Sequence, residues 1–401
     1  MADGFIKGPR PLSLHFSNSQ VIWGAAGESA GAALEAGHWH KDIADVAVLL
    51  RTRLAHSGGH DRFDQIVREK ANARKETFLS GINEYLSRDY DRRPSEAHVC
   101  MELGGVQVQD FGGAGAPILM VPSLINPHYI LDLMPGRSLA AYLKMQGYRP
   151  YLVKWGEPGE EEIHFGLDDY ICKRLMPVLD FLTETAGGRV PVIGYCMGGT
   201  LSTALAARTS EQVSKLALLA APWDFATEHP HAGRKFVPAM IKHMKNVPGV
   251  GTIGVDMLQT FFASVDPTLN DRKFRSYAAG KYQGEQADFF SAMEVWANNG
   301  APLARKVAEQ CLKGWYVDND TMEERWTVAG EPVRLADIDC PVWIAAPEGD
   351  RLVPQESAFA MLTRLKDGTS HAPPSGHIGM VVGDRAEAGL WEPLCEWLEA
   401  K

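Results

Sequence analysis

The chain has 401 residues, of which 45% are hydrophobic and 22% charged, a composition typical of a globular protein long enough to bury one large core. Its formal net charge of −10, without a long basic run, argues against a general nucleic-acid binder. The N-terminus has no apolar signal segment, and no apolar run reaches membrane-spanning length. We therefore expect a cytoplasmic protein with no transmembrane segment.

Residues 1–95 are predicted to form an N-terminal helical extension. Two polar stretches within it, 38–57 and 60–88, carry apolar residues at the spacing of one helix face. We expect this extension to pack on the main domain.

From residue 96 the pattern changes to strands that alternate with helices. Most of the strands are apolar on both faces, which favours a largely parallel sheet covered by helices on each side. We expect this α/β core to comprise residues 96–225 and 336–401. The predicted strands are 98–103, 106–111, 117–122, 148–155, 190–195, 213–222 and 340–350, and the predicted helices are 138–146, 167–187 and 354–368.

The most informative stretch is Val-Ile-Gly-Tyr-Cys-Met-Gly-Gly-Thr at 192–200. A buried strand that runs into G-x-C-x-G and then into a helix is typical of the nucleophile elbow of the α/β-hydrolase fold, with cysteine in place of serine. The turn is sharp, and a side chain at Gly194 or Gly198 would collide with neighbouring backbone. We predict that Cys196 is the nucleophile. Because a cysteine forms a thioester, which passes its acyl group readily to another nucleophile, acyl transfer is expected alongside hydrolysis.

Such a nucleophile needs backbone amides to hold the oxyanion that develops during acyl transfer. The amide of Met197 lies at the predicted helix start directly after Cys196. The second donor usually comes from the loop after an earlier strand, which here is Pro122–Asn126. Leu124 and Ile125 are both candidates for this backbone donor.

Between 226 and 335 the alternation of strands and helices stops. This segment is rich in aromatic residues and methionine, and the core fold needs far fewer residues here. We interpret it as an inserted cap over the active site. Most of its large apolar side chains are expected to form the cap's own core, and the hypothesis that some line an acyl channel rests on their location alone.

A cysteine nucleophile also needs a base and a carboxylate that orients the base, in the chain order nucleophile, acid, histidine. A late strand ends in Pro-Glu-Gly-Asp at 347–350, and Ser-Gly-His-Ile-Gly at 375–379 lies shortly before a terminal helix. We predict a triad of Cys196, His377 and Asp350, with Glu348 as the rival acid. Each residue alone is a weak signal, and the joint match in order and context carries the prediction. The six cysteines form no C-x-x-C and none has a histidine at metal-ligand spacing, so no metal site is expected.

These residues lie in segments that resemble the polyhydroxyalkanoate synthases, which polymerise 3-hydroxyacyl-CoA into storage polyester. The resemblance runs from about residue 100 to 385. The matching segments are Val121–Leu133, Gln146–Gly156, Gly194–Thr200, Glu348–Pro354 and Ser375–Gly379. The cysteine box with its second glycine is fairly specific to that family.

The resemblance implies that Cys196 accepts the acyl group, that His377 is the base and that Asp350 is its carboxylate partner. It implies a 3-hydroxyacyl-CoA substrate, a polyester product and no cofactor apart from the CoA thioester itself. A homodimer and association with polymer granules are further implied partners. One departure is Arg351, where many synthases have a histidine directly after the catalytic aspartate.

Two other functions stay open on the sequence alone. The triad is equally compatible with a hydrolase, such as a thioesterase or an intracellular polyester depolymerase, because the exclusion of water is a property of the cap. A granule-associated or regulatory protein without activity is the third alternative, and the intact triad argues against it.

Overall fold

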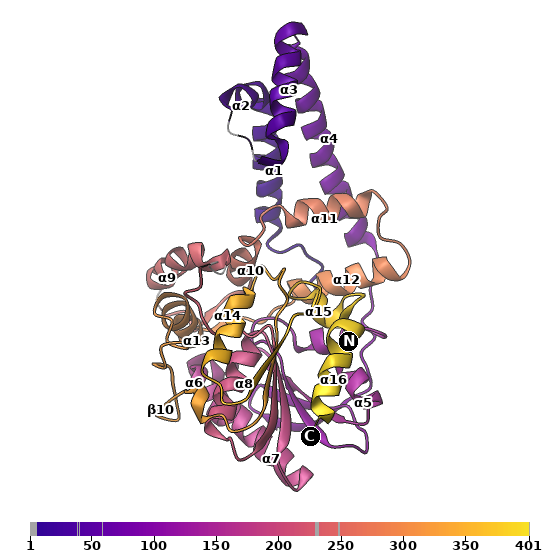
Figure 1. The fold of residues 1–401 in the computed structure, drawn as a ribbon. Coiled ribbons are helices and arrows are strands. Elements are labelled where there is room, and N and C mark those ends of the chain that lie inside the picture. The colour runs from indigo at the N-terminus through magenta and orange to yellow at the C-terminus, as the bar shows by residue number, and fades with distance from the viewer. Residues whose placement is uncertain are drawn as a thin grey trace. The chain divides into compact units, whose positions relative to one another are not determined.

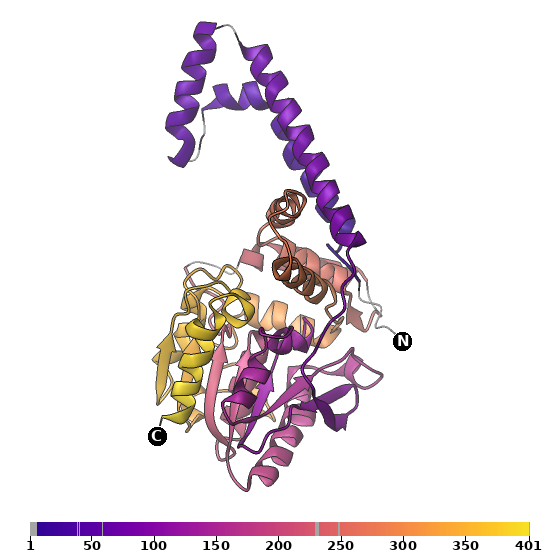
Figure 2. The ribbon, with the colours of Figure 1, turned by 90° about the vertical axis from the view of Figure 1, so that its right-hand side faces the viewer.

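A computed structural model describes residues 6–37, 39, 41–57, 59–228, 232–247 and 249–400 (Figures 1 and 2). His38 and His40, which belong to the predicted helical stretch 38–57, lie outside the described residues. The chain divides into two compact units, Met1–Tyr90 with Asp266–Glu294 and Asp91–Val265 with Val295–Lys401.

The first unit is helical. Its long helix α4 packs closely on α11, since a Cβ on Gly81 would lie 1.9 Å from the carbonyl oxygen of Phe274. Its buried hydrophobic core, which is aromatic apart from Ile82, consists of Phe78, Ile82, Tyr85, Phe274 and Phe290. The helices are α1 (Leu12–Glu28), α2 (Ala30–Ala36), α3 (Lys41–Ser57), α4 (His60–Ser87), α11 (Leu269–Ala278) and the greater part of α12 (Glu285–Asn298).

The second unit is built on an eight-stranded sheet with the order β1-β2-β4-β3-β5-β6-β11-β12. The first two strands pair antiparallel, β2 is antiparallel to β4, and the remaining neighbours are parallel, which confirms the predicted, mostly parallel α/β sheet. The strands are β1 (His98–Leu103), β2 (Val106–Asp110), β3 (Pro117–Val121), β4 (Arg149–Lys154), β5 (Val190–Tyr195), β6 (Val213–Leu219), β11 (Val342–Ala345) and β12 (Gly368–His371).

Helices cover both faces of this sheet, as Figure 1 shows, with α5 and α16 on one side and α6, α7, α8 and α14 on the other. All five residues of β3 and all four of β11 are buried, as the unbroken apolar runs predict. The covering helices are α5 (Leu139–Met145), α6 (Leu167–Tyr170), α7 (Met176–Ala186), α8 (Met197–Arg208), α14 (Gln355–Phe359) and α16 (Glu392–Glu399).

The segment predicted as a cap, 226–335, is shared between the two units. Residues 266–294 group with the N-terminal helices, and the rest group with the sheet. The part in the second unit contains α9 (Val237–Asn246), β7 (Thr252–Ile253), α10 (Val255–Ala263), β8 (Leu303–Ala304), α13 (Arg305–Glu309), the π-helical turn η5 (Gln310–Val317), β9 (Thr327–Val328) and β10 (Glu331–Pro332). Its role as a cap, like the boundaries of the three predicted domains, stays a prediction.

Three glycines let β5, α8 and the end of β3 approach one another closely. A Cβ on Gly194 would lie 2.5 Å from the Cα of Gly199, and a Cβ on Gly199 would lie 2.4 Å from the Cβ of Ala221. A Cβ on Gly198 would lie 2.2 Å from the carbonyl oxygen of Val121 and 2.3 Å from that of Pro122. The first turn of α8 is therefore in contact with the backbone that leads out of β3.

This packing makes Gly198 a sensitive position. We expect Gly198→Ala to lower the free energy of unfolding by about 1–3 kcal/mol or more, because the added methyl overlaps main-chain atoms that side-chain rotation cannot move away. The control is Gly188→Ala, since a Cβ on Gly188 meets nothing within 4 Å. Thermal unfolding of the two variants provides the comparison, and equal midpoints would contradict the contact.

Candidate active site

Cys196 lies at the tip of the turn between β5 and α8. Its backbone has φ 55° and ψ −127°, a conformation that a residue other than glycine adopts only under strain. The amide of Cys196 donates to the carbonyl of Leu219 over 2.8 Å, which ties the turn to the end of β6. The side chain is partly exposed, so this strained turn presents a thiol to a reagent that approaches from outside the core.

Asp350 is buried and its two carboxylate oxygens have separate partners. Oδ1 accepts hydrogen bonds from the amides of Leu352, at 2.8 Å, and Val353, at 2.9 Å. Oδ2 lies 2.7 Å from Nδ1 of His377. Glu348, the rival acid in the sequence, is exposed, so the structure brings Asp350 and not Glu348 to the histidine.

His377 has a strongly perturbed pKa. Burial by itself would lower this pKa, but the charges of Asp350 and Cys196 and side-chain hydrogen bonds to both residues raise it from 6.5 to about 10. These interactions place Cys196, His377 and Asp350 in one cluster. An imidazole that is protonated at neutral pH carries a positive charge, and this charge favours a thiolate beside it.

Tyr195, the last residue of β5, contacts the histidine from the strand that leads into Cys196. Its ring centroid lies 5.4 Å from that of His377, and its hydroxyl donates to the His377 carbonyl over 3.4 Å. The tyrosine is almost fully buried. The sequence did not single out this residue, because its position beside Cys196 does not reveal which way the ring points.

The loop after β3 is the predicted source of an oxyanion donor. The contact at Gly198 brings this loop against the first turn of α8. The amide of Ile125 donates to Oγ of Ser123 over 3.3 Å, whereas the amides of Met197 and Leu124 have no hydrogen-bond partner within the described part of the chain. The oxyanion roles of Met197, Leu124 and Ile125 stay predictions.

Tyr316, a residue of the predicted cap, lies near Cys196. Burial, together with the charges of Cys196 and Cys311, raises the pKa of Tyr316 above its ordinary value. The ring centroid of Tyr316 lies 4.9 Å from that of Phe225 and 5.8 Å from that of Phe261. An aromatic cluster from η5 and α10 therefore extends to the surroundings of Cys196.

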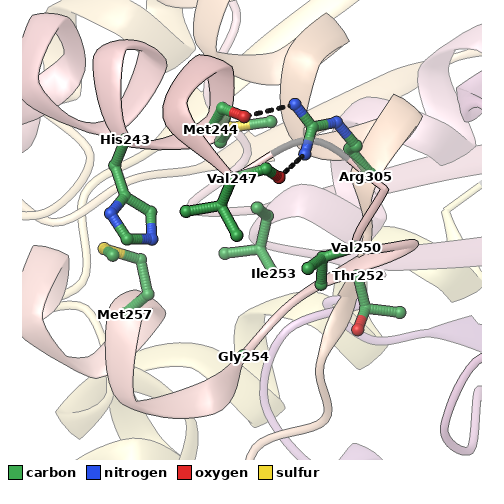
Figure 3. A pocket seen from close by; sticks show the side chains of 9 residues that line it. All are labelled: His243, Met244, Val247, Val250, Thr252, Ile253, Gly254, Met257 and Arg305. Carbon is green, nitrogen blue, oxygen red and sulfur yellow. Dashed lines mark hydrogen bonds between the residues drawn. The ribbon is translucent and has the colours of Figure 1, made fainter.

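A small cavity of about 120 Å³ lies apart from the predicted triad, and none of the triad residues lines it (Figure 3). Its lining is mainly apolar and includes His243, Met244 and Met257. Arg305, at its edge, donates to the carbonyls of Met244 and Val247 at the end of α9, so its guanidinium group is engaged by backbone (Figure 3). Over the described ranges, no group of three or more His, Cys, Asp or Glu side chains is arranged to hold a metal ion.

Comparison of the sequence with models of known families identifies the family of this chain. The model of the Alpha/beta hydrolase family matches residues 118–389, which is most of the chain. The chain belongs to the alpha/beta hydrolase family. The predicted fold is thereby confirmed, and the elbow, acid and histidine of this alpha/beta hydrolase occur in the order that the fold uses.

Curated relatives of this alpha/beta hydrolase confirm the resemblance found in the sequence. The chain is similar to proteins named poly(3-hydroxyalkanoate) polymerase subunit PhaC. That of Haloarcula marismortui is 32% identical over 75% of this chain and 64% of its own length, and that of Haloferax mediterranei is 31% identical over 70% and 58%. That of Allochromatium vinosum is 29% identical over 71% of this chain and 81% of its own length. The chain thus spans about three fifths of the two haloarchaeal proteins.

A substitution of Asp350 tests whether its charge raises the pKa of His377. The raised pKa of His377 means that protonation of its imidazole stabilises the folded protein. This stabilisation is fully present below pH 6.5 and is lost as the pH rises through about 10. Asp350→Asn removes a charge that raises this pKa, so we expect His377 to lose its proton at lower pH. We also expect turnover to fall by about 10²–10⁴. Nuclear magnetic resonance titration of the labelled histidine provides the measurement, and an unchanged midpoint would contradict the assignment.

Proposed function

We propose that this alpha/beta hydrolase is a polyhydroxyalkanoate synthase, an acyltransferase that polymerises 3-hydroxyacyl-CoA through a thioester on Cys196. The observation that carries the proposal is a cysteine at the elbow, beside a histidine that a buried carboxylate holds through Nδ1. The similarity to curated poly(3-hydroxyalkanoate) polymerase subunits supports the same substrate class.

In the first half of the proposed reaction, the thiolate of Cys196 attacks the carbonyl carbon of the acyl-CoA thioester. His377 then gives its proton to the sulfur of the departing CoA, which leaves as a thiol. In the second half, His377 takes the proton of the 3-hydroxyl of another hydroxyacyl unit. That oxygen attacks the acyl carbon on Cys196, and the thiolate leaves as the new ester forms. Asp350 holds the imidazole in place throughout.

The location and partners proposed here follow from this activity. We place the protein in the cytoplasm at the surface of its growing polyester product, and a homodimer is part of the proposal. Within the described residues, no helix is both long enough and apolar enough to cross a membrane.

The deciding experiment mixes the protein with 3-hydroxyacyl-CoA of different chain lengths and follows free thiol and turbidity together. We expect thiol release accompanied by turbidity, because each CoA released extends an insoluble chain. Thiol release without turbidity would identify a hydrolase instead, and neither signal from folded protein would rule out both activities.

Two substitutions test the proposed nucleophile and base in the same assay. We expect Cys196→Ala and His377→Ala each to abolish thiol release, because the first removes the acyl acceptor and the second removes the proton carrier. Cys340→Ala, which changes a buried cysteine outside the predicted triad, serves as the control for cysteine removal. Comparable thiol release by either triad variant would contradict the mechanism.

A further inference from the structure

The loop that follows β3 is held at both of its ends by tryptophan side chains. Nε1 of Trp155 donates to the carbonyl of Pro122 over 2.9 Å, and Nε1 of Trp296 donates to the carbonyl of Pro127 over 2.9 Å. Both side chains are well buried, with 6% of Trp155 and 4% of Trp296 exposed. An indole N–H buried at this depth is costly to leave unpaired, so each bond fixes the carbonyl that it reaches.

The middle of the same loop is fixed by a third contact. The amide of Ala301 donates to the carbonyl of Ile125 over 3.0 Å. The preceding residue, Gly300, lies so close that a Cβ there would be 2.9 Å from this carbonyl oxygen. Residues 296–301 of the predicted cap therefore contact the loop at two separate carbonyls.

These contacts distinguish the two candidate donors in the loop. Both backbone polar groups of Ile125 are engaged, since its carbonyl accepts from Ala301 and its amide donates to Ser123. Leu124 lies between the fixed carbonyls, and its own amide has no partner in the described ranges of the chain. The contact between Gly198 and the Pro122 carbonyl keeps this part of the loop beside the first turn of α8.

We propose that Trp155, Trp296 and Ala301 form a brace that positions the amide of Leu124 as the second oxyanion donor. The proposal rests on the acyl transfer at Cys196 proposed above. Trp155, Trp296 and Ala301 are positioning residues and not donors to the oxyanion. They act through Leu124, and Trp296 and Ala301 make the predicted cap a structural part of the oxyanion site.

The physical reason is preorganisation. An oxyanion donor accelerates the reaction only if it already points at the position where the charge develops, because a loop that must reorder during the reaction loses part of the gain. Within residues 122–127, three backbone carbonyls accept hydrogen bonds from donors outside this stretch. Loosening one of them should weaken acylation without changing the thiol or its base.

The test compares Trp296→Phe with Trp326→Phe. Phenylalanine keeps a buried ring but removes the indole N–H. Trp326 is a matched control because it is also buried, at 7% exposed, and its Nε1 has no hydrogen-bond partner in the structure as described. We expect Trp296→Phe to lower kcat for CoA release from 3-hydroxybutyryl-CoA by about 10- to 100-fold, with KM changed less than about twofold, and Trp326→Phe to change kcat far less.

A second readout separates the brace from damage to the nucleophile or to the fold. Alkylation of Cys196 by iodoacetamide needs the thiolate but forms no oxyanion, so we expect Trp296→Phe to alkylate at the wild-type rate. Gly300→Ala, which pushes on the Ile125 carbonyl, is expected to show the same pattern. Equal kcat values for Trp296→Phe and Trp326→Phe, or a parallel fall of alkylation and kcat in Trp296→Phe, would overturn the proposal.

The same comparison is run with a p-nitrophenyl acyl ester, which reports acylation of Cys196 without CoA. If the wild-type protein cleaves the ester but not the CoA thioester, the proposed substrate is wrong. The brace is then tested by the kcat values of the two tryptophan variants with the ester. If the wild-type protein is acylated by neither reagent, both proposals fail.

Discussion

The close contact between the start of α8 and the end of β3 is the constraint on which the site depends. It exists because Gly198 carries no side chain, so that backbone meets backbone at distances that a Cβ would not allow, and Gly194 and Gly199 allow an equally close approach of α8 to β5 and Ala221. The contact fixes the strained turn at Cys196 and places the loop after β3 beside it. Cys196 and the candidate oxyanion donors are thus arranged by packing alone.

The charges around Cys196 complement this geometry. Asp350 is itself held by two backbone amides, so the carboxylate cannot turn away from His377 without breaking three hydrogen bonds. Its charge, together with the charge of Cys196 and the hydrogen bonds to both residues, outweighs the burial of the imidazole and raises the pKa of His377 to about 10. A protonated imidazole in this position can deliver its proton to a leaving group as a general acid. Tyr195 packs on the same ring and limits its rotation.

Much of this was predictable from sequence because the decisive features are local. The glycines around Cys196 must be glycines for steric reasons, and Asp350 and His377 follow strand ends in the order that the fold imposes. Strands such as β3 and β11 were predictable because their apolar runs are unbroken, whereas β12 was not predicted, since its Gly-Thr-Ser-His sequence is not apolar and is mostly exposed. The indole donors Trp155 and Trp296 were not, because a hydrogen bond across distant segments leaves no periodicity. The assignment of 266–294 to the helical unit was missed likewise, since aromatic residues in a helix do not reveal which neighbour they pack against.

If the acyl group passes through Cys196, the acyl-enzyme intermediate can be trapped on this residue. The protein would be mixed with 3-hydroxybutyryl-CoA, quenched in acid within one turnover and digested for peptide mass spectrometry. We expect a 3-hydroxybutyryl adduct on the peptide that contains Cys196, and no adduct on the peptides of the other cysteines. An adduct on a different residue, or CoA release without any adduct on Cys196, would contradict this expectation.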